Sequence, residues 1–299
     1  MNSVYNEYGY LRLLSNVLDS GEYRETRNGK VYSSFGKMIT FENIYTCFPL
    51  LTTKKIYFKG IVEELLWFLR GSTNSKELQS KGVHIWDGNS SREYLDENGF
   101  SHYNEGELGP IYGWQWRNFG KSYKDNTDNS SGTDQIKYVI NELIKPDYSR
   151  RAVLSAWNPN QLAEMALPPC HILYTFYKDK NGLSCLMNMR SSDLFLGLPF
   201  NIASTALLTS IIAKVLHIDP YKISITLTDA HIYEEHIDAV NIQLKNDILA
   251  LPTLLINKDV PSLDSNIDDK INWINNLNYD DFQLLNYNSA AYIKAPMKS

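Results

Sequence analysis

The chain has 299 residues and a net charge of −5, with 43% hydrophobic and 21% charged residues. This composition is typical of a globular protein and excludes intrinsic disorder and fibrous repeats. Bulk binding to DNA or RNA requires a surplus of Lys and Arg, so the mild acidity argues against it. Because no linker or repeat divides the sequence, we expect a single domain over residues 1–299.

The sequence also bears on membranes, location and metals. The N-terminal segment lacks a basic stretch followed by an apolar run, so we expect no secretory signal and a cytoplasmic location. Polar residues interrupt the most apolar long stretch, residues 202–218, which argues against a membrane span. The three cysteines, Cys47, Cys170 and Cys185, show no metal-ligand spacing, so neither a structural zinc site nor a disulfide scaffold is expected.

The first half of the chain begins with apolar residues at helical spacing, which predict a helix over residues 4–18. Residues 31–41 are expected to be extended, with a bulge at Gly36. A strongly apolar helix should follow over residues 58–70. Residues 87–132 are rich in Asn, Asp, Ser and Gly and are expected to form loops around one short ordered piece.

The second half alternates expected strands and helices, which predicts an α/β or α+β fold with a large sheet. Thr133 is the expected N-terminal cap of a helix that ends at Ile144, before Pro146. The expected strands are residues 152–157, 171–177, 183–190 and 222–228, and the expected later helices are residues 201–217 and 233–245.

Cys170 follows two prolines at the start of a predicted strand, where a rigid turn would present its side chain. A thiolate is a strong nucleophile when nearby positive charge lowers its pKa. The alternative is a small buried hydrophobe, which suits Cys47 and Cys185 in their apolar surroundings. Arg150–Arg151 and Arg190 flank neighbouring predicted strands, and guanidinium groups bind phosphate. Together these residues predict a nucleophile beside an anion site.

Strand parity sharpens this prediction, because residues two apart point to the same face of a sheet. Asn188 and Arg190 therefore share one face of their strand. Further along, Asp229, His231 and Tyr233 emerge at the end of the next strand, a common place for ligand-binding side chains. A polar ligand site is expected where these two strands end.

Glu63 and Glu64 lie in an apolar helix whose period turns one of them toward the apolar face and the other toward solvent. A carboxylate on the apolar face must be paired, hydrogen-bonded or protonated. The alternative is two solvent-facing acids. His171 and His231 could act in acid–base chemistry, or they could be hydrogen-bonded residues near the core.

Several long motifs occur in one order along the chain: ELLWFLRG, KGVHIWD, LGPIYGWQWRNFG, SAWNPNQLAEMALPPCH, RSSDLFLGLPFNIAS and DAHIYEEH. With these motifs the chain resembles the thymidylate synthase family, folate-dependent enzymes that methylate deoxyuridylate (dUMP), over nearly its whole length. The resemblance implies a single-domain α/β (α+β) fold. A large twisted mixed sheet would be packed by helices, and one sheet face would form a homodimer interface.

The resemblance also implies roles for the candidate residues. Cys170 would attack C6 of the uracil ring, which makes C5 nucleophilic toward the methylene carried by tetrahydrofolate. Glu64, Tyr112 and His171 would take part in proton transfer at the ring. Asn201 would read the O4 and N3 edge, because an amide both accepts and donates hydrogen bonds.

Binding roles follow from the same resemblance. Arg27, Arg190 and Ser191 would bind the phosphate, and Arg150 and Arg151 would reach it from the partner subunit. His231 and Tyr233 would contact the deoxyribose. The folate pocket would be lined by Trp86, Asp193, Gly197 and Phe200. Asp193 would hydrogen-bond the pterin and take part in catalysis. The cosubstrate 5,10-methylenetetrahydrofolate would supply carbon and hydride, with no metal and no nicotinamide.

Two departures from the family pattern keep an alternative open. Met189 stands where a glutamine is expected, and Lys298 and Ser299 replace the small apolar residues that usually close the chain. These changes motivate a dUMP hydroxymethylase, in which water captures the exocyclic methylene and tetrahydrofolate is returned. A second alternative, an inactive nucleotide- or RNA-binding relative, conflicts with the complete residue set around Cys170.

Overall fold

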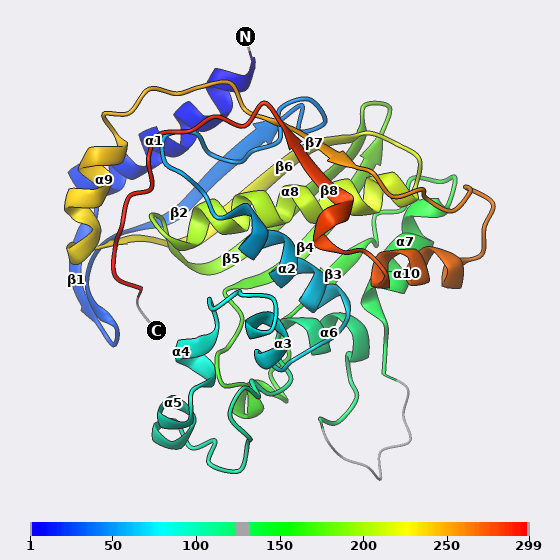
Figure 1. Cartoon of the computed structure of the whole chain (residues 1–299), viewed down its shortest axis with the longest axis horizontal. Helices are drawn as coiled ribbons and strands as arrows, with labels where there is room; N and C mark the ends of the chain where they lie inside the picture. The colour runs from blue at the N-terminus through cyan, green and yellow to red at the C-terminus, as the bar shows by residue number, and fades with distance from the viewer. Residues whose placement is uncertain (1, 124–131, 298–299) are drawn as a thin grey trace.

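A six-stranded mixed sheet lies at the centre of the fold (Figure 1). The computed structural model describes residues 2–123 and 132–297. The strands of this sheet are β1 (Glu22–Thr26), β2 (Gly29–Glu42), β3 (Val153–Ser155), β4 (His171–Asp179), β5 (Gly182–Asp193) and β6 (Pro220–Tyr233). Their order is β1-β2-β6-β5-β4-β3, in which β5 and β6 are parallel and the other neighbours are antiparallel. The expected fold class, a large mixed sheet packed by helices, is confirmed.

Helices and a small second sheet surround this centre. The helices are α1 (Asn2–Ser20), α2 (Phe58–Leu69), α3 (Lys76–Gln79), α4 (Asp87–Ser90), α5 (Arg92–Glu97), α6 (Tyr112–Asn118), α7 (Gln135–Ile144), α8 (Gly197–Val215), α9 (Ile237–Gln243) and α10 (Ile267–Asn275). Strands β7 (Thr253–Ile256) and β8 (Phe282–Leu285) pair with each other. The chain ends in an extended segment that passes beside α9 (Figure 1).

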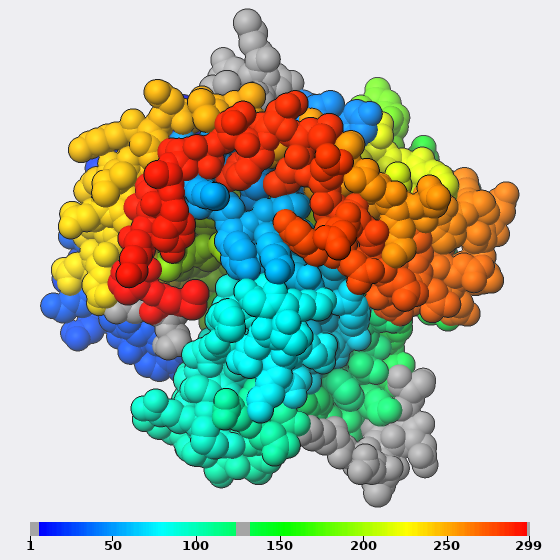
Figure 2. Space-filling model, in the orientation of Figure 1, coloured from blue at the N-terminus to red at the C-terminus, as the bar shows by residue number. Residues whose placement is uncertain are grey.

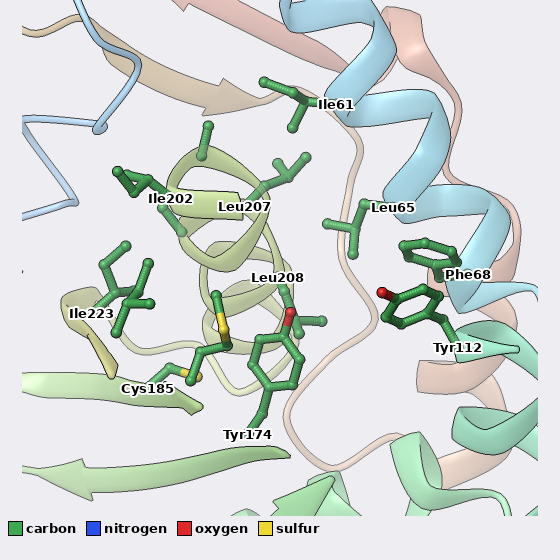
Figure 3. Close-up of a cluster of buried hydrophobic side chains, with 14 of the residues drawn as sticks. Ile61, Leu65, Phe68, Tyr112, Tyr174, Cys185, Ile202, Leu207, Leu208 and Ile223 are labelled. Atoms are coloured by element: carbon green, nitrogen blue, oxygen red, sulfur yellow. The ribbon is translucent and has the colours of Figure 1, made fainter. Parts of the chain in front are cut away.

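The core lies between α8 and the inner face of the sheet. Ile223, Ile225 and Leu227 of β6 are fully buried, whereas the hydroxyl side chains that alternate with them are only partly buried. This alternation is the expected period of two. Figure 3 shows Leu207 and Leu208 of α8 within the same apolar cluster. Each fully buried aliphatic side chain stabilises the fold by about 1.5–3 kcal/mol.

Among the described residues, only helix α8 is long and apolar enough to cross a membrane, but 78% of its apolar stretch is buried inside the protein. It begins at Gly197 rather than at the predicted Asn201. The structure therefore places Asn201 one turn inside the helix, where its Nδ2 donates to the Gly197 carbonyl at 3.0 Å.

Several predicted elements need correction. The segment expected to form loops contains the short helices α4 and α5, because Ser91 caps α5 by accepting a hydrogen bond from the Tyr94 amide. Asp134, not Thr133, caps α7, since its carboxylate accepts the Lys137 amide. Gly36 has a φ of 67° but forms no bulge, because β2 and β6 keep one register on both sides of it.

The end of β6 differs most from the prediction. The strand was expected to stop at Thr228, but it continues to Tyr233 because β2 and β5 both pair with its last residues. The helix predicted over residues 233–245 is correspondingly reduced to α9, after a short 3₁₀ turn. Asp229, His231 and Tyr233 therefore lie on a strand held from both sides.

Candidate active site

The sequence-predicted residues converge at one edge of the sheet. The parallel strands β5 and β6 end there together, with Ser191 paired to Asp229 and Asp193 paired to His231. Strand β4 starts at the same edge, which brings Cys170 beside the end of β5. Figure 2 shows a hollow in this face, bordered by the red C-terminal segment and the cyan segment that contains α3 and α4.

Cys170 is half-buried, and Arg190 holds its surroundings in place. The Arg190 guanidinium donates to the carbonyl oxygens of Pro168 and Pro169, at 2.9 and 2.7 Å. Its Nη2 also lies 3.8 Å from the Cys170 Sγ. One arginine therefore fixes the diproline turn and directs positive charge at the sulfur.

The resting thiol is nevertheless protonated. Burial raises the pKa of Cys170, and the opposing effects of Arg190 and the Tyr112 hydroxyl only reduce that rise. Arg190 does lower the thiol pKa, as expected. Burial raises it by more, so the thiol pKa as a whole is higher than expected. The thiol must lose its proton before it can act as a nucleophile.

Tyr112 and His171 form an aromatic wall next to the sulfur. The Tyr112 hydroxyl accepts a hydrogen bond from the Cys170 amide at 2.7 Å, and its ring stacks on His171 with centroids 4.2 Å apart. Figure 3 shows Phe68 of α2 next to Tyr112, and their ring centroids are 4.9 Å apart. Burial raises the pKa of the Tyr112 phenol and lowers the pKa of His171 to about 3. Both groups are therefore neutral near pH 7.

Glu64 contributes the carboxyl group of this wall. Its Oε1 accepts a hydrogen bond from the Trp86 indole at 2.7 Å. Burial raises the pKa of Glu64 to about 7, and the indole hydrogen bond reduces that rise. The carboxyl group is thus poised to gain or lose a proton near neutrality.

The expectation that one of the two glutamates faces solvent is wrong, because Glu63 is buried as well. It is only 5% exposed, and its Oε2 pairs with the Lys81 ammonium at 2.6 Å. The helical period did separate the two side chains, but the chain beyond α3 covers the second one. Glu63 is a structural ion pair, whereas Glu64 belongs to the candidate site.

Gly197 begins α8 shortly after β5, and Asn201 lies one helical turn further along. A Cβ added to Gly197 would lie 3.7 Å from the Cβ of Asp193 and 3.9 Å from Nδ2 of Asn201, so the three residues are close neighbours. One Nδ2 hydrogen of Asn201 binds the Gly197 carbonyl. Its second Nδ2 hydrogen is a further donor. Phe200, also on this turn, is half-buried against the core.

Asp193 is an anion held by the backbone. Its Oδ1 accepts the amides of Phe195 and Leu196 at 2.9 and 3.3 Å. Burial raises the pKa of Asp193, but His236 and the Phe195 amide outweigh burial and hold the pKa below its usual value. The carboxylate therefore stays charged at pH 7.

The remaining candidates surround the end of β6. His231 Nδ1 lies 3.1 Å from the Asp229 carboxylate, which orients the ring. Burial raises the pKa of Tyr233, and the positive charge of Arg27 acts in the opposite direction. The exposed Arg27 therefore lies near Tyr233, at the turn between β1 and β2. Ser191 is half-buried on β5, next to Arg190.

Arg150 and Arg151 are not brought to the site within one chain. They are exposed and precede β3, which pairs Val153 with Thr175 of β4. The stretch from Thr175 back to Cys170 spans roughly 16 Å at about 3.3 Å per residue. Both arginines lie beyond that stretch, so they cannot reach a ligand at Cys170 of the same chain.

The comparisons with known proteins agree with these features. The family model described as thymidylate synthase matches residues 8–299. The chain belongs to the thymidylate synthase family. A thymidylate synthase of Saccharomyces cerevisiae is 45% identical over 97% of this chain and 96% of its own length. One of Herpesvirus ateles is 44% identical over 99% of both chains.

Longer relatives also match. A bifunctional dihydrofolate reductase-thymidylate synthase of Zea mays is 47% identical over 87% of this chain. The match covers 50% of that relative, so the chain spans about half the length of the bifunctional plant proteins.

Sequence reasoning missed two residues that lie beside Asp193 in the candidate site. Lys54 is 4% exposed, donates to the Phe195 carbonyl and lies 3.5 Å from the centre of the Phe195 ring. Burial lowers the pKa of Lys54 to about 7, although Asp193 opposes this. His236 is fully buried beside Asp193. Lys54 carries no local signal that the sequence analysis used, and His236, although it ends the DAHIYEEH motif, is brought to Asp193 only by the fold.

The structure describes only one of the two departures from the family pattern, Met189. Met189 is 2% exposed and faces the core together with Met187, on the sheet face opposite Arg190, and it is paired with His171 across the two strands. Lys298 and Ser299 lie outside the described residues. Among residues 2–123 and 132–297, no group of three or more His, Cys, Asp or Glu side chains could hold a metal ion.

Proposed function

We propose that the chain is a thymidylate synthase, a methyltransferase that converts dUMP to dTMP by reductive methylation. The cosubstrate 5,10-methylenetetrahydrofolate supplies both carbon and hydride and leaves as dihydrofolate. The proposal rests on the position of Cys170, which lies between Arg190 and Tyr112. Glu64 and Asn201 lie near the same edge of the sheet. The full-length family match supports the same reaction.

The nucleophile is Cys170. Its sulfur forms a bond to C6 of the uracil, and the electrons of the C5–C6 double bond move toward C5 and O4. Arg190 stabilises the thiolate once the proton has left, because its guanidinium lies 3.8 Å from the sulfur. Because burial keeps the resting thiol protonated, ionisation accompanies substrate binding.

Proton transfer at the ring uses Glu64 and Tyr112. The pKa of Glu64, about 7, allows its carboxyl group to donate toward O4 and to recover the proton at neutral pH. The Tyr112 phenol remains protonated and can order a water molecule near C5, where a proton must leave. His171 is neutral and supports the Tyr112 ring.

Substrate choice depends on Asn201. Its Oδ1 can accept N3–H of uracil, and its free Nδ2 hydrogen can donate to O4. Arg27, Arg190 and Ser191 bind the phosphate, and His231 and Tyr233 contact the deoxyribose. For the folate, the Asp193 anion is an acceptor for N–H groups of a flat heterocycle, and Trp86 and Phe200 supply aromatic walls.

Hydride transfer is favoured over capture by water. The relatives named thymidylate synthase support the same product.

We also propose a homodimer formed through the outer face of the sheet. Met38, Tyr177 and Leu186 lie on this face and are 66%, 59% and 36% exposed, which indicates an unpartnered apolar surface. Arg150 and Arg151, which cannot reach Cys170 of their own chain, would bind phosphate in the partner subunit. We place residues 1–299 in one domain and the enzyme in the cytoplasm.

Mass spectrometry of the nucleotide formed from dUMP and 5,10-methylenetetrahydrofolate tests the reaction, with simultaneous detection of dihydrofolate. We expect gain of one CH₂ unit and one dihydrofolate per dTMP. A hydroxymethyl product with tetrahydrofolate returned would establish the hydroxymethylase instead. Binding of dUMP without turnover would support an inactive relative.

Mixing two inactive variants tests the dimer. Cys170→Ser supplies intact arginines, and Arg150→Ala with Arg151→Ala supplies an intact nucleophile. Heterodimers of the two contain one complete site, so activity should return on mixing. Continued inactivity of a mixture shown to contain heterodimers would contradict the donation of these arginines.

A further inference from the structure

The C-terminal strap, defined here as residues 286–297, borders the hollow (Figure 2). Its first part is attached to the segment before α2: the Ala290 amide donates to the Thr52 carbonyl at 2.8 Å, and the Lys55 amide donates to the Ala291 carbonyl at 3.3 Å. Further along, the Pro296 carbonyl oxygen lies 2.8 Å from Nε2 of His236. His236 therefore anchors the strap near its described end.

His236 also faces Asp193, the proposed folate contact. Its Nδ1 lies 3.6 Å from Oδ1 of Asp193, an ion-pair distance that is longer than a hydrogen bond. The side chain is fully buried between two aromatic rings, with centroid distances of 5.6 Å to Phe195 and 5.3 Å to Tyr233. The ring thus lies between the strap and the end of β5.

The two contacts favour a protonated ring, and Nδ1 makes no hydrogen bond that would require its lone pair. Pro296 and Asp193 both present oxygen acceptors, one to each ring nitrogen. A neutral imidazole has one N–H, so its second nitrogen would direct a lone pair at an oxygen. Only the imidazolium presents an N–H to each. Asp193, which is already an anion, supplies the balancing charge.

We propose that His236 is a positioning residue that, as an imidazolium, clasps the strap to Asp193 and so holds the folate side of the hollow in its closed form. This inference rests on the proposed function for its effect on folate. The clasp itself is a property of the protein alone. The proton on His236 therefore couples the position of the strap to the Asp193 carboxylate, the proposed folate contact.

The charges around His236 agree with this state. The titratable groups are Asp193 at the end of β5, Tyr233 at the end of β6, Lys54 before α2, and Glu234 and Glu235 on its own turn. Burial lowers the pKa of His236, but Asp193 and the Pro296 carbonyl outweigh burial and the charge of Lys54, so the pKa lies above its ordinary value. The clasp therefore holds below this raised pKa and opens as pH rises through it.

The test compares His236→Gln with His217→Gln. Glutamine at 236 can donate to Pro296 but cannot titrate, and its oxygen repels Asp193. His217 is a matched control, because its Nε2 makes a similar 2.8 Å contact to the Pro261 carbonyl at an exposed position away from the hollow. Carboxypeptidase trimming of the strap and the KM for 5,10-methylenetetrahydrofolate are measured for both variants.

For His236→Gln we expect strap trimming and the folate KM to rise roughly tenfold, the equivalent of one charge-assisted hydrogen bond. The Kd for dUMP alone should stay within about twofold, which separates positioning from general loss of structure. The wild-type rise of folate KM at alkaline pH should vanish in this variant. His217→Gln should behave like the wild type.

Unchanged trimming and folate KM in His236→Gln would overturn the inference. If that variant fails to fold, a ¹⁵N NMR titration of the wild-type imidazole decides: a pKa of His236 above its ordinary value supports the clasp, and a pKa at or below that value contradicts it. If the wild type makes no dTMP, the proposed function fails. The trimming and NMR results still test the clasp in that case.

Discussion

The two walls of the hollow differ in whether burial or pairing has the larger effect on the pKa values of their side chains. On the wall formed by Cys170, Tyr112, His171 and Glu64, burial outweighs pairing, and these groups are wholly or partly uncharged near pH 7. On the wall formed by Asp193 and His236, pairing outweighs burial: the pKa of Asp193 lies below and the pKa of His236 lies above its usual value, so both shifts favour the charged form. Neutral groups suit proton transfer, and fixed charges suit binding. Under the proposed function, chemistry and cosubstrate binding are therefore separated across one edge of the sheet.

The largest expected effect is the loss of turnover in Cys170→Ser on the neutral wall. A hydroxyl is a far weaker nucleophile, so kcat should fall by roughly four orders of magnitude or more. Binding of dUMP should persist within a few-fold, because Arg190 keeps its contacts with Pro168 and Pro169. Steady-state kinetics and calorimetry measure the two effects. Retained turnover would remove Cys170 from the mechanism.

Glu64→Gln should lower kcat by about 10²–10³-fold, since it removes a general acid–base group, and should remove the pH dependence near 7. Stability gives a second readout. The folded pKa of Glu64, about 7, is raised above its unfolded value of about 4.5. Wild-type stability therefore falls as pH rises from about 4.5 to about 7. The variant should therefore have the higher Tm at pH 8, and this difference should disappear near pH 4.

Glu63→Gln is the matched control for that experiment. It weakens the pair between buried Glu63 and the partly exposed Lys81 and should cost stability of about 1 kcal/mol. Its kcat and pH profile should match the wild type. Equal losses of kcat in both variants would mean that the helix, rather than the Glu64 carboxyl group, carries the effect.

Asp193→Asn tests the charged wall. Loss of the anion should raise the folate KM roughly tenfold and leave dUMP binding within about twofold. The pKa of His236 should fall, because its counter-charge is removed. NMR titration of the imidazole measures this shift. A similar loss of dUMP affinity would contradict the separation of the two walls.

His171→Asn should give the smallest effect, a loss of roughly tenfold or less in kcat, through a looser Tyr112 ring. Because burial holds the pKa of His171 at about 3, the pH profile between 5 and 9 should not change. Loss of a pH-dependent limb in this range would show that His171 titrates during turnover and that the wall is not neutral.

Sequence reasoning found what local pattern determines. The alternation in β5 correctly placed Asn188 and Arg190 opposite Met187 and Met189. It stopped β6 at Thr228, because pairing with β2 and β5 extends that strand and depends on contacts far apart in the sequence. Motif resemblance supplied most candidate site residues.

Electrostatic balance could not be predicted from the sequence. Positive charge near Cys170 suggested a depressed thiol pKa, but the degree of burial decides the sum. Lys54 and His236 join the site through contacts with Phe195, Asp193 and Pro296 from distant segments. No spacing rule in the chain indicates these contacts.

The most direct test of the account is intact-protein mass spectrometry with 5-fluoro-dUMP and 5,10-methylenetetrahydrofolate. Fluorine cannot leave C5 as a proton does, so the reaction should stop with nucleotide and folate bound to the protein. We expect one covalent ternary adduct per chain, mapped to the peptide that contains Cys170 and absent from Cys170→Ser. Turnover of dUMP with no such adduct, or an adduct at another residue, would contradict nucleophilic catalysis by Cys170.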